Sequence, residues 1–339
     1  MDATSAAGGP ATDCVPGFVA GIGMNTSTQV LSGRNTVVLA DARGRSVRLV
    51  HLNIEPPPSL PSTRLGYSVG HWNGDTLVVE TTGLSSGRTV VERFRVTQGG
   101  QVESIVDGRA ALANGPYALR TLEPSCSAPA LAVDATRRRG SVITIDAHPS
   151  LEGSWTLAAP VLRLKTTAGR APPLLTAASR IFQEQHTQWQ ADAAARDKAS
   201  ACRVLEEPRA SYQSPGLDIV LGTDTIFVGY APWARVRFVP LGEDFDGAVG
   251  GRIGRWRAHW DHEALVLEGE GFDATTALDA TGLQHSAQLR VVQRLTLKQN
   301  GRTLEVRSVF TDPATFSRSW ETIHTYRRQT RPPDESPGC

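Results

Sequence analysis

The sequence has no apolar run of about 18 residues, the length that a membrane-spanning helix needs, so no membrane span is expected. It also has little net charge, because 35 lysine and arginine residues balance 34 aspartate and glutamate residues. The basic stretch at 137–139 is short, whereas nucleic-acid binding requires a broad basic surface. These shortages argue against a membrane-spanning protein and against a nucleic-acid-binding protein.

Cysteine is scarce, with four in 339 residues, and none of them form a CxxC pair, so no zinc site is expected. Cys14 and Cys126 fall in the first half and Cys202 and Cys339 in the second, which suits one disulfide in each half of an exported protein. The first residues lack the basic start and apolar centre of a signal peptide. Two locations therefore stay open: the cytoplasm, or a secreted or periplasmic location for a mature form carrying an added Met.

The chain carries no nucleotide, flavin or haem signature, so no organic cofactor is expected. What it does have is 40% hydrophobic and 20% charged residues, a balance typical of globular proteins with well-formed cores. Its length predicts roughly two domains.

The stretch 66–84 predicts a β-hairpin, because two apolar runs flank Asn73-Gly74, a dipeptide whose residues tolerate positive φ. Three of its residues recur downstream: Gly70 and Trp72 as Gly254 and Trp256 at an offset of 184, and Glu80 as Glu268 at an offset of 188. The chain is therefore predicted to be a tandem repeat.

Further short apolar runs, separated by turn residues, predict antiparallel strands of a barrel or sandwich. They fall at 36–40, 46–52, 89–96 and 102–106 in the first half and at 219–221, 225–229 and 234–239 in the second. Between the halves, 141–145 and 153–157 could also be strands. Residues 174–196 follow helical spacing and predict one helix that bridges or caps the two β-units.

The predicted fold is mainly β, with two tandem antiparallel β-barrel-like units of a lipocalin-like kind and one connecting helix. The segments are a lead-in at 1–13, a first unit at 14–135, a connecting segment at 136–201, a second unit at 202–330 and a tail at 331–339. The strand at 90–96 matches 291–297 at an offset of 201, against 188 for Glu80 and Glu268, so the second unit carries 13 additional residues. We place this insertion at 273–286.

Residues 70–81, Gly-His-Trp-Asn-Gly-Asp-Thr-Leu-Val-Val-Glu-Thr, resemble the motif G-x-W-E-G-D-T-L-V-V-E-T of a large family of bacterial proteins, mostly secreted and uncharacterised. The likeness continues at 285–286, at 292–294 and from Asp312 to Trp320. The second hairpin departs from the pattern by lacking Gly-Asp-Thr, and the first unit lacks His-Ser. The resemblance implies a secreted relative of similar fold and no particular reaction.

Alternation along the strands separates structural from functional polar residues. Glu80 with Arg93, and Glu268 with Arg294, recur in both halves and are read as cross-strand ion pairs that support the sheets. Glu92 and Gln293 share their side of the strand with apolar residues and should point inward. A buried carboxyl group needs a partner and tends to have a raised pKa, so Glu92 is a candidate for lining a cavity.

Two other patterns are read as structural. The GxSxG pattern at 66–70 precedes a hairpin, whereas the hydrolase elbow requires a helix after its serine, so no nucleophile is expected there. The cluster His259-Trp-Asp-His-Glu263 offers possible metal ligands, but it replaces a hairpin turn in which neighbouring side chains diverge.

Besides Glu92, which is also a catalytic candidate, the catalytic candidates lie around the insertion. His285 is suited to proton transfer near neutral pH, and Asp312 could orient it. The residues expected to bind a ligand beside them are Tyr230, Trp233, Trp256, Trp320, Ser286 and Gln293.

Three functions fit these features. One is a cofactor-independent acid–base enzyme (an isomerase, cyclase, lyase or hydratase) whose substrate is a hydrophobic small molecule held in the second barrel under a mobile lid at 273–286. The second is a non-catalytic binding protein for a lipid, polyphenol or glycan, and the third is a structural secreted module. Polar groups that converge inside a cavity favour the enzyme over the binding protein.

Overall fold

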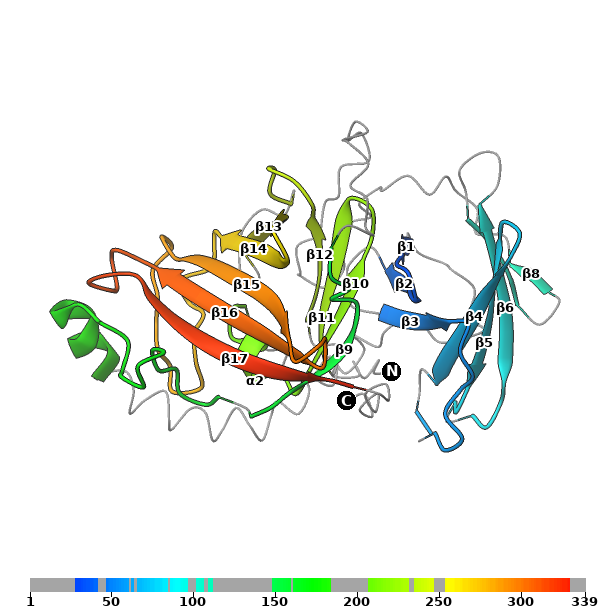
Figure 1. Ribbon diagram of the computed structural model, residues 1–339, viewed down its shortest axis with the longest axis horizontal. Helices are drawn as coiled ribbons and strands as arrows, with labels where there is room; N and C mark the ends of the chain where they lie inside the picture. Colours follow the sequence, from blue (N-terminus) through cyan, green and yellow to red (C-terminus); the bar gives the residue numbers. More distant parts are fainter. Residues whose placement is uncertain are drawn as a thin grey trace, which may run out of the picture.

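The computed structural model describes residues 28–41, 47–60, 62–63, 66–84, 86–96, 102–106, 109–111, 148–159, 161–183, 207–231, 235–246 and 254–329 (Figure 1). The four cysteines and Trp233 lie outside these residues, as does the predicted strand at 141–145. The disulfide prediction therefore stays a prediction.

The first half forms an eight-stranded sheet in simple sequence order. Its strands are β1 (Thr28–Ser32), β2 (Thr36–Asp41), β3 (Val47–Leu52), β4 (Tyr67–Asn73), β5 (Thr76–Thr82), β6 (Val90–Val96), β7 (Val102–Val106) and β8 (Arg109–Ala111). β4 and β5 form the predicted hairpin, and Gly74 takes the expected positive φ of 62° in its turn.

The second half forms a nine-stranded sheet in the order β12-β11-β10-β9-β17-β16-β15-β14-β13. Its strands are β9 (Gly153–Leu157), β10 (Gly216–Leu221), β11 (Thr225–Ala231), β12 (Arg235–Pro240), β13 (Arg255–Asp261), β14 (Ala264–Glu270), β15 (Arg290–Lys298), β16 (Thr303–Thr311) and β17 (Trp320–Arg328). A bridge between Leu241 and Ala258 links the two ends of this order, so the sheet is a nearly closed barrel. The mainly β fold with barrel-like structure is confirmed.

Each sheet contains one parallel pairing, although only antiparallel pairing was expected. It joins β3 to β4 in the first sheet and the end of β12 to β13 in the second. In the first sheet Leu52 pairs with Gly70 in parallel, and the Asn53 N–H donates to the Gly70 carbonyl over 2.9 Å. In the second the Gly242 N–H donates to the Ala258 carbonyl over 2.8 Å, beside the parallel Leu241–Ala258 bridge. The preceding connections are long enough for the crossover that parallel strands require.

The hairpin turns correct one predicted match between the halves. Gly74 and His262 occupy the same turn position, with φ of 62° and 55°. When the two hairpins are aligned by their turns, Trp72 corresponds to Trp260. The predicted match of Gly70 and Trp72 with Gly254 and Trp256 was therefore wrong by four positions. Glycine is required instead at the entry to each hairpin, where Gly66 and Gly254 have φ of 68° and 65°.

The predicted insertion is confirmed by strand register. Glu92 pairs with Val79 across β5 and β6, and Gln293 pairs with Leu267 across β14 and β15, so Glu92 and Gln293 are equivalent. The additional residues therefore lie in the connection 271–289, between β14 and β15.

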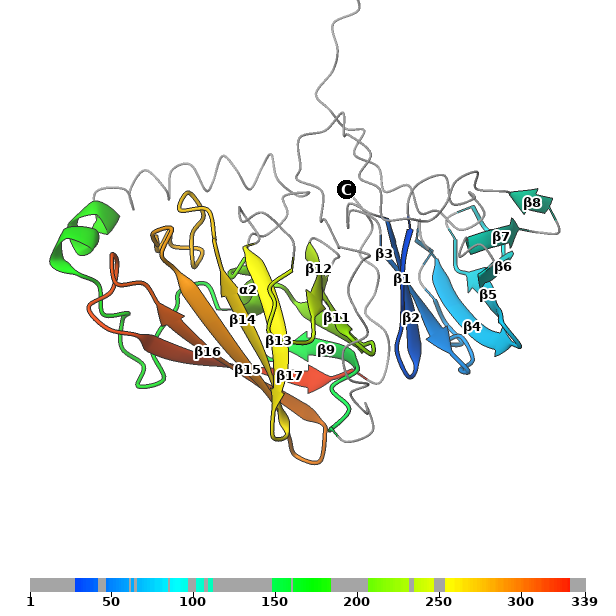
Figure 2. The same ribbon diagram turned by 90° about the horizontal axis from the view of Figure 1, so that it is seen from above.

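The two units pack face to face through the outer surface of the barrel (Figure 2). Strands β2 and β3 meet β10, β11 and β12, and one apolar cluster joins them: Val38, Val47, Leu49, Val220, Phe227, Val236 and Phe238, with Leu31 at its border. Phe227 and Phe238 are in edge-to-face contact. The inner sides of β10 to β12 contribute to the barrel core, so these strands are buried on both faces.

The predicted helix is present in part, helical over 176–183 within the described residues. It lies at the end of the second unit farthest from the first, so it does not bridge the units there (Figure 1). A short helix, α2 (Ala210–Gln213), lies against the barrel strands. Among the described residues, no helix is long and apolar enough to cross a membrane.

Candidate functional site

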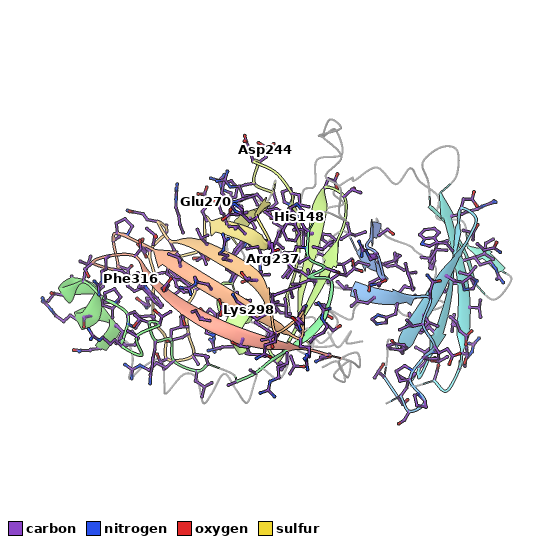
Figure 3. The ribbon with its side chains drawn as sticks, viewed as in Figure 1. His148, Arg237, Asp244, Glu270, Lys298 and Phe316 are labelled. Carbon is purple, nitrogen blue, oxygen red and sulfur yellow. The ribbon has the colours of Figure 1, made fainter. Side chains whose placement is uncertain are left out.

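The barrel interior brings together most of the predicted ligand-binding residues, as parts of a packed core. Arg237 lies among the strands of the second unit (Figure 3). Its Nη2 donates to the Tyr230 hydroxyl over 2.7 Å, and its guanidinium lies 3.9 Å from the ring centre of Trp256. Trp320 stacks on Phe310 at 4.5 Å. Burial raises the pKa of Tyr230, although Arg237 opposes the shift.

Residues 207–213 occupy this interior and supply its polar partners. Glu207 forms an ion pair with Arg237, with 3.3 Å between Oε1 and Nε. Gln293 points inward as predicted and donates to the Ser211 hydroxyl over 2.9 Å. Tyr326 donates to the Ser211 carbonyl. The interior is thus packed with protein groups, although Ser308 Oγ, Trp320 Nε1 and His324 Nε2 are buried without a hydrogen-bond partner among the described residues.

The insertion 273–286 forms part of this packed structure instead of a mobile lid. Its Leu278 is fully buried, and Tyr212 donates to the Leu278 carbonyl. Asp279 accepts from the backbone N–H of Leu164 over 2.9 Å, and the Ala280 N–H donates to the Leu162 carbonyl over 3.0 Å. The insertion therefore closes one end of the barrel.

His285 is buried inside this closure. Its Nδ1 donates to its neighbour's carbonyl, that of Ser286, over 2.8 Å, and its Nε2 lies 2.7 Å from the Thr276 hydroxyl. Burial lowers its pKa, against the raising effect of the Ser286 carbonyl and of two nearby carboxylates. Both ring nitrogens are thus engaged in holding the loop.

Asp312 contacts Ser286 instead of acting directly on the His285 ring. Its carboxylate accepts from the Ser286 N–H over 2.6 Å and from the Ser286 hydroxyl over 2.7 Å. Desolvation works to raise the Asp312 pKa, but these hydrogen bonds outweigh it and hold the pKa below its usual value. Asp312 therefore anchors the end of the insertion.

Glu92 is buried, as predicted, within the first unit, where it forms an ion pair with Arg48. Arg48 also donates to the Ser68 hydroxyl over 2.9 Å, which lies 2.8 Å from the Thr81 hydroxyl. Ser68 is thus a structural serine, as expected. Arg48 and Arg237 occupy equivalent positions of β3 and β12, so each unit encloses one buried arginine.

The predicted ion pair between Glu268 and Arg294 is not the one that forms. Glu268 pairs with Arg257 over 2.8 Å, and Arg294 pairs with Asp261, because these are the nearer neighbours on the outer face. The described residues contain no cluster of three or more side chains suited to a metal ion, including around His259.

A cavity of about 240 Å³ lies where the two units meet. The first unit lines it with Asn35, Thr36, Leu49, His51, Ile54 and Tyr67; the second with Glu152, Gly153, Ser154, Asp218, Ile219, Val220, Arg328 and Gln329. Titratable groups from both units converge on it, which makes it the candidate site.

Asp218 is the most perturbed carboxyl group of this cavity. It lies on β10, whose Leu217 and Ile219 point into the barrel core, so its side chain points outward. Its Oδ1 accepts from Ser154, whereas Oδ2 is buried without a hydrogen-bond partner among the described residues. Burial raises the pKa of Asp218 to about 7, with Ser154 opposing the shift. Asp218 can therefore gain or lose a proton near neutral pH.

The first unit contributes an aromatic wall. His51 stacks on Tyr67 with 4.9 Å between ring centres and 17° between planes. Burial lowers the pKa of His51 to about 4, so this ring is neutral near pH 7. Both aromatic residues thus line the same cavity as Asp218.

Glu152 and Arg328 hold the cavity in shape. Glu152 accepts from the backbone N–H groups of Arg34 and Asn35, over 3.0 and 2.8 Å, and so fastens the β1–β2 turn to the second unit. Arg328 donates to the carbonyls of Glu152, Ser150 and Gly301 and lies over the Trp155 ring at 4.2 Å.

A second hollow, of about 610 Å³, lies on the outer face of β14 to β16. Its Arg294 is paired with Asp261 and its Arg307 with Glu321. These ion pairs are half-exposed. It is a weaker candidate than the cavity between the units.

Sequence reasoning missed the residues of this cavity, although one signal was visible. Asp218 is the one charged residue within the apolar run 216–221, and a carboxyl group there must be buried or mark an edge. The contact between the units carried no such signal. A prediction based on one unit at a time could not find a site that both units build.

We expect replacement of Asp218 by asparagine to change how stability depends on pH. Wild-type Asp218 stays protonated in the fold up to about pH 7, while the unfolded chain ionises near pH 4. Its contribution to stability is therefore present at low pH and is lost as the pH rises through this window. The stability of Asp218→Asn relative to wild type should rise by up to about 1.4 kcal/mol per pH unit there.

Urea unfolding of both proteins across this range measures the difference. Burial lowers the pKa of His51 and of His324 to about 4, so both stabilise the fold increasingly as pH rises above that value. These two contributions to stability are the same in wild type and Asp218→Asn, so they cancel when the two proteins are compared. Parallel stability curves for the two proteins would contradict the raised pKa.

Comparison with protein-family models, with curated proteins and with solved structures found no match to this chain.

Proposed function

We propose that the protein is a cofactor-independent acid–base enzyme acting on a small molecule bound between its two units, with Asp218 as the group that transfers the proton. The observation that carries the proposal is the Asp218 carboxyl group, which lines the cavity, has a pKa of about 7 and leaves Oδ2 without a partner among the described residues. A proton donor or acceptor works best when its pKa lies near the working pH.

The neighbouring groups fit this role. Ser154 donates to Oδ1 of Asp218 and so orients the carboxyl group, with Oδ2 left for the substrate. His51, Tyr67 and Ile54 supply ring and aliphatic surface against which an apolar part of the substrate packs. The volume is below the range of about 300–1,000 Å³ typical of drug-sized ligands, so the substrate is small.

The barrel interior supports this role less well. His285 uses both ring nitrogens on the loop that holds it, and Asp312 uses its carboxylate on Ser286. Tyr230, Trp256 and Gln293 contact protein groups in a filled core. We therefore move the proposed chemistry from the barrel to the cavity between the units.

The proposal is tested by incubating the protein with a bacterial metabolite extract in D₂O and following deuterium by mass spectrometry. Isomerisation, elimination and hydration all move a proton through the catalytic acid or base, so wild type should introduce deuterium into a substrate. Asp218→Asn cannot exchange this proton and should act roughly 100-fold more slowly.

Asp224→Asn is the matched control, because Asp224 lies exposed on the turn that follows β10 and should leave the rate unchanged. Equal rates for wild type and Asp218→Asn would contradict the role of Asp218. A compound that the protein retains and releases unchanged would favour the alternative of a non-catalytic binding protein.

A further inference from the structure

Two residues that line the cavity carry an unpartnered acceptor oxygen. Asp218 Oδ2 and Gln329 Oε1 are both buried without a hydrogen-bond partner among the described residues, and both belong to residues that line the cavity. Each is an oxygen that accepts and does not donate when Asp218 is ionised. A ligand that satisfies them must bring donors.

Arg328 is the arginine that lines the cavity, and its donor groups are already engaged. Arg328 directs Nε, Nη1 and Nη2 to three backbone carbonyls, over 2.8, 2.8 and 3.0 Å, and its guanidinium lies over Trp155. His51 is neutral near pH 7 because burial lowers its pKa to about 4. A carboxylate or phosphate would therefore find the donors of Arg328 engaged and would lie beside the carboxyl groups of Asp218 and Glu152.

The aromatic wall suits a cation. The face of a tyrosine ring carries partial negative charge and attracts an ammonium group, more strongly when the group is removed from water. Tyr67 lines the same cavity as Asp218, with His51 stacked on its ring. An ammonium group can also donate three hydrogen bonds.

From these observations we propose that the ligand of the cavity between the units is a small protonated amine with an apolar, ring-sized body. Gln329 Oε1 and one lone pair of Asp218 Oδ2 accept from the ammonium group, which leaves the second lone pair of Oδ2 for proton transfer, and His51, Tyr67 and Ile54 contact the body. The inference rests on the same cavity as the proposed function and specifies its substrate class.

Several titratable or charged groups face Asp218 across the cavity or pack against it from other elements. They are His51 on β3, Tyr67 on β4, Glu152 before β9 and Arg328 on β17. Glu152 is bound to backbone N–H groups, and Arg328 is bound to carbonyls. Burial lowers the pKa of His51 to about 4 and raises the pKa of Asp218 to about 7. Amine affinity should therefore follow the ionisation of Asp218.

The test uses three probes of matched shape, namely benzylamine, benzyl alcohol and benzoate, and measures their binding to the full chain by calorimetry. Near pH 8 benzylamine should bind at least about 10-fold more tightly than the other two. As the pH falls below about 7, its affinity should fall by up to about tenfold per pH unit, while that of benzyl alcohol stays constant.

Asp218→Asn should weaken benzylamine binding roughly 10- to 100-fold and remove its pH dependence, leaving benzyl alcohol nearly unaffected. Asp224→Asn should behave as wild type. Benzoate or benzyl alcohol binding as tightly as benzylamine, full amine binding by Asp218→Asn, or no binding of any probe would overturn the inference.

The outcomes separate the two proposals. Deuterium transfer that depends on Asp218, together with a preference for benzyl alcohol or benzoate, would reject the amine and leave the acid–base function. Amine binding that depends on Asp218, without deuterium transfer to any compound, would keep the ligand class and reject the enzyme.

Discussion

Replacing Arg237 with alanine is expected to lower the free energy of unfolding by about 3–5 kcal/mol, because it leaves the Glu207 carboxylate buried without its counter-charge. Both side chains are almost completely shielded from solvent, at 2% and 0% exposed, with 3.3 Å between Nε and Oε1. The same change removes the hydrogen bond to Tyr230 and the contact with the Trp256 ring. Chemical unfolding of the full chain, followed by tryptophan fluorescence, measures the loss.

Arg255→Ala provides the control. Arg255 also pairs with a glutamate, Glu270, but its side chain is 49% exposed, and an exposed pair contributes less than about 1 kcal/mol. Replacing both partners of the buried pair, as Glu207→Gln with Arg237→Met, should recover part of the stability, since no lone charge remains. An Arg237→Ala protein as stable as Arg255→Ala would show that the buried pair does not support the barrel.

The second large effect is expected at Asp279, in the insertion that closes the barrel. Its Oδ1 accepts from the Thr281 N–H, the Thr281 hydroxyl and the Leu283 N–H, at 2.9, 2.7 and 3.2 Å, and its Oδ2 accepts from the Leu164 N–H at 2.9 Å. Asp279→Ala leaves the buried N–H groups of Leu164 and Leu283 unpaired. The expected loss of stability is about 2–5 kcal/mol.

Asp273→Ala is a matched control within the same insertion. Asp273 accepts from the N–H and hydroxyl of Thr275, as Asp279 does from Thr281, but at the surface. Water replaces these bonds, so the loss should stay below about 1 kcal/mol. Hydrogen exchange at the Leu164 amide should accelerate in Asp279→Ala alone. If both variants kept wild-type stability, the insertion would be a loosely held loop, in agreement with the mobile lid that the sequence predicts at 273–286.

Much of the fold was predictable because local patterns determine it. The alternation in 153–157 and 102–106 gave strands with the observed bounds, β9 and β7, and Asn73-Gly74 marked a real hairpin. The inward side of Glu92 and Gln293 followed from the same alternation. Turn chemistry and period-two patterning act over a few residues, so one sequence suffices to read them.

The parallel step and the hairpin register were not predictable in the same way. A strand's pattern indicates which side is buried, but not which neighbour Leu52 or Leu241 will pair with, because that depends on a long connection. The wrong register followed from matching Trp72 with Trp256 by sequence letters. The positive φ at His262 identifies the turn, and no glycine signals it there.

The candidate site escaped prediction because its residues come together only in the packed chain. Asp218 and His51 belong to different units, and the burial that shifts both pKa values exists only where the units meet. Arg48 and Arg237 could have been noticed in the sequence. Each is a charged residue on the inward side of an otherwise largely apolar strand, β3 or β12, and the two positions are equivalent. His285 attracted attention for its chemistry, although the structure uses it to hold a loop.

The position of β9 has a consequence for dividing this chain into fragments. β9 pairs with β10 on one side and with β17 on the other. It nevertheless lies far ahead of β10 in the sequence, within the segment 136–201 that was predicted to connect the two units. A fragment that starts after Leu157 lacks β9. The edges of β10 and β17 that face β9 are then unpaired, and these two strands run in the same direction. Unpaired edges recruit strands from other molecules, so such a fragment is prone to aggregate or to exchange strands with its copies. An expression fragment of the second unit must therefore begin ahead of Gly153.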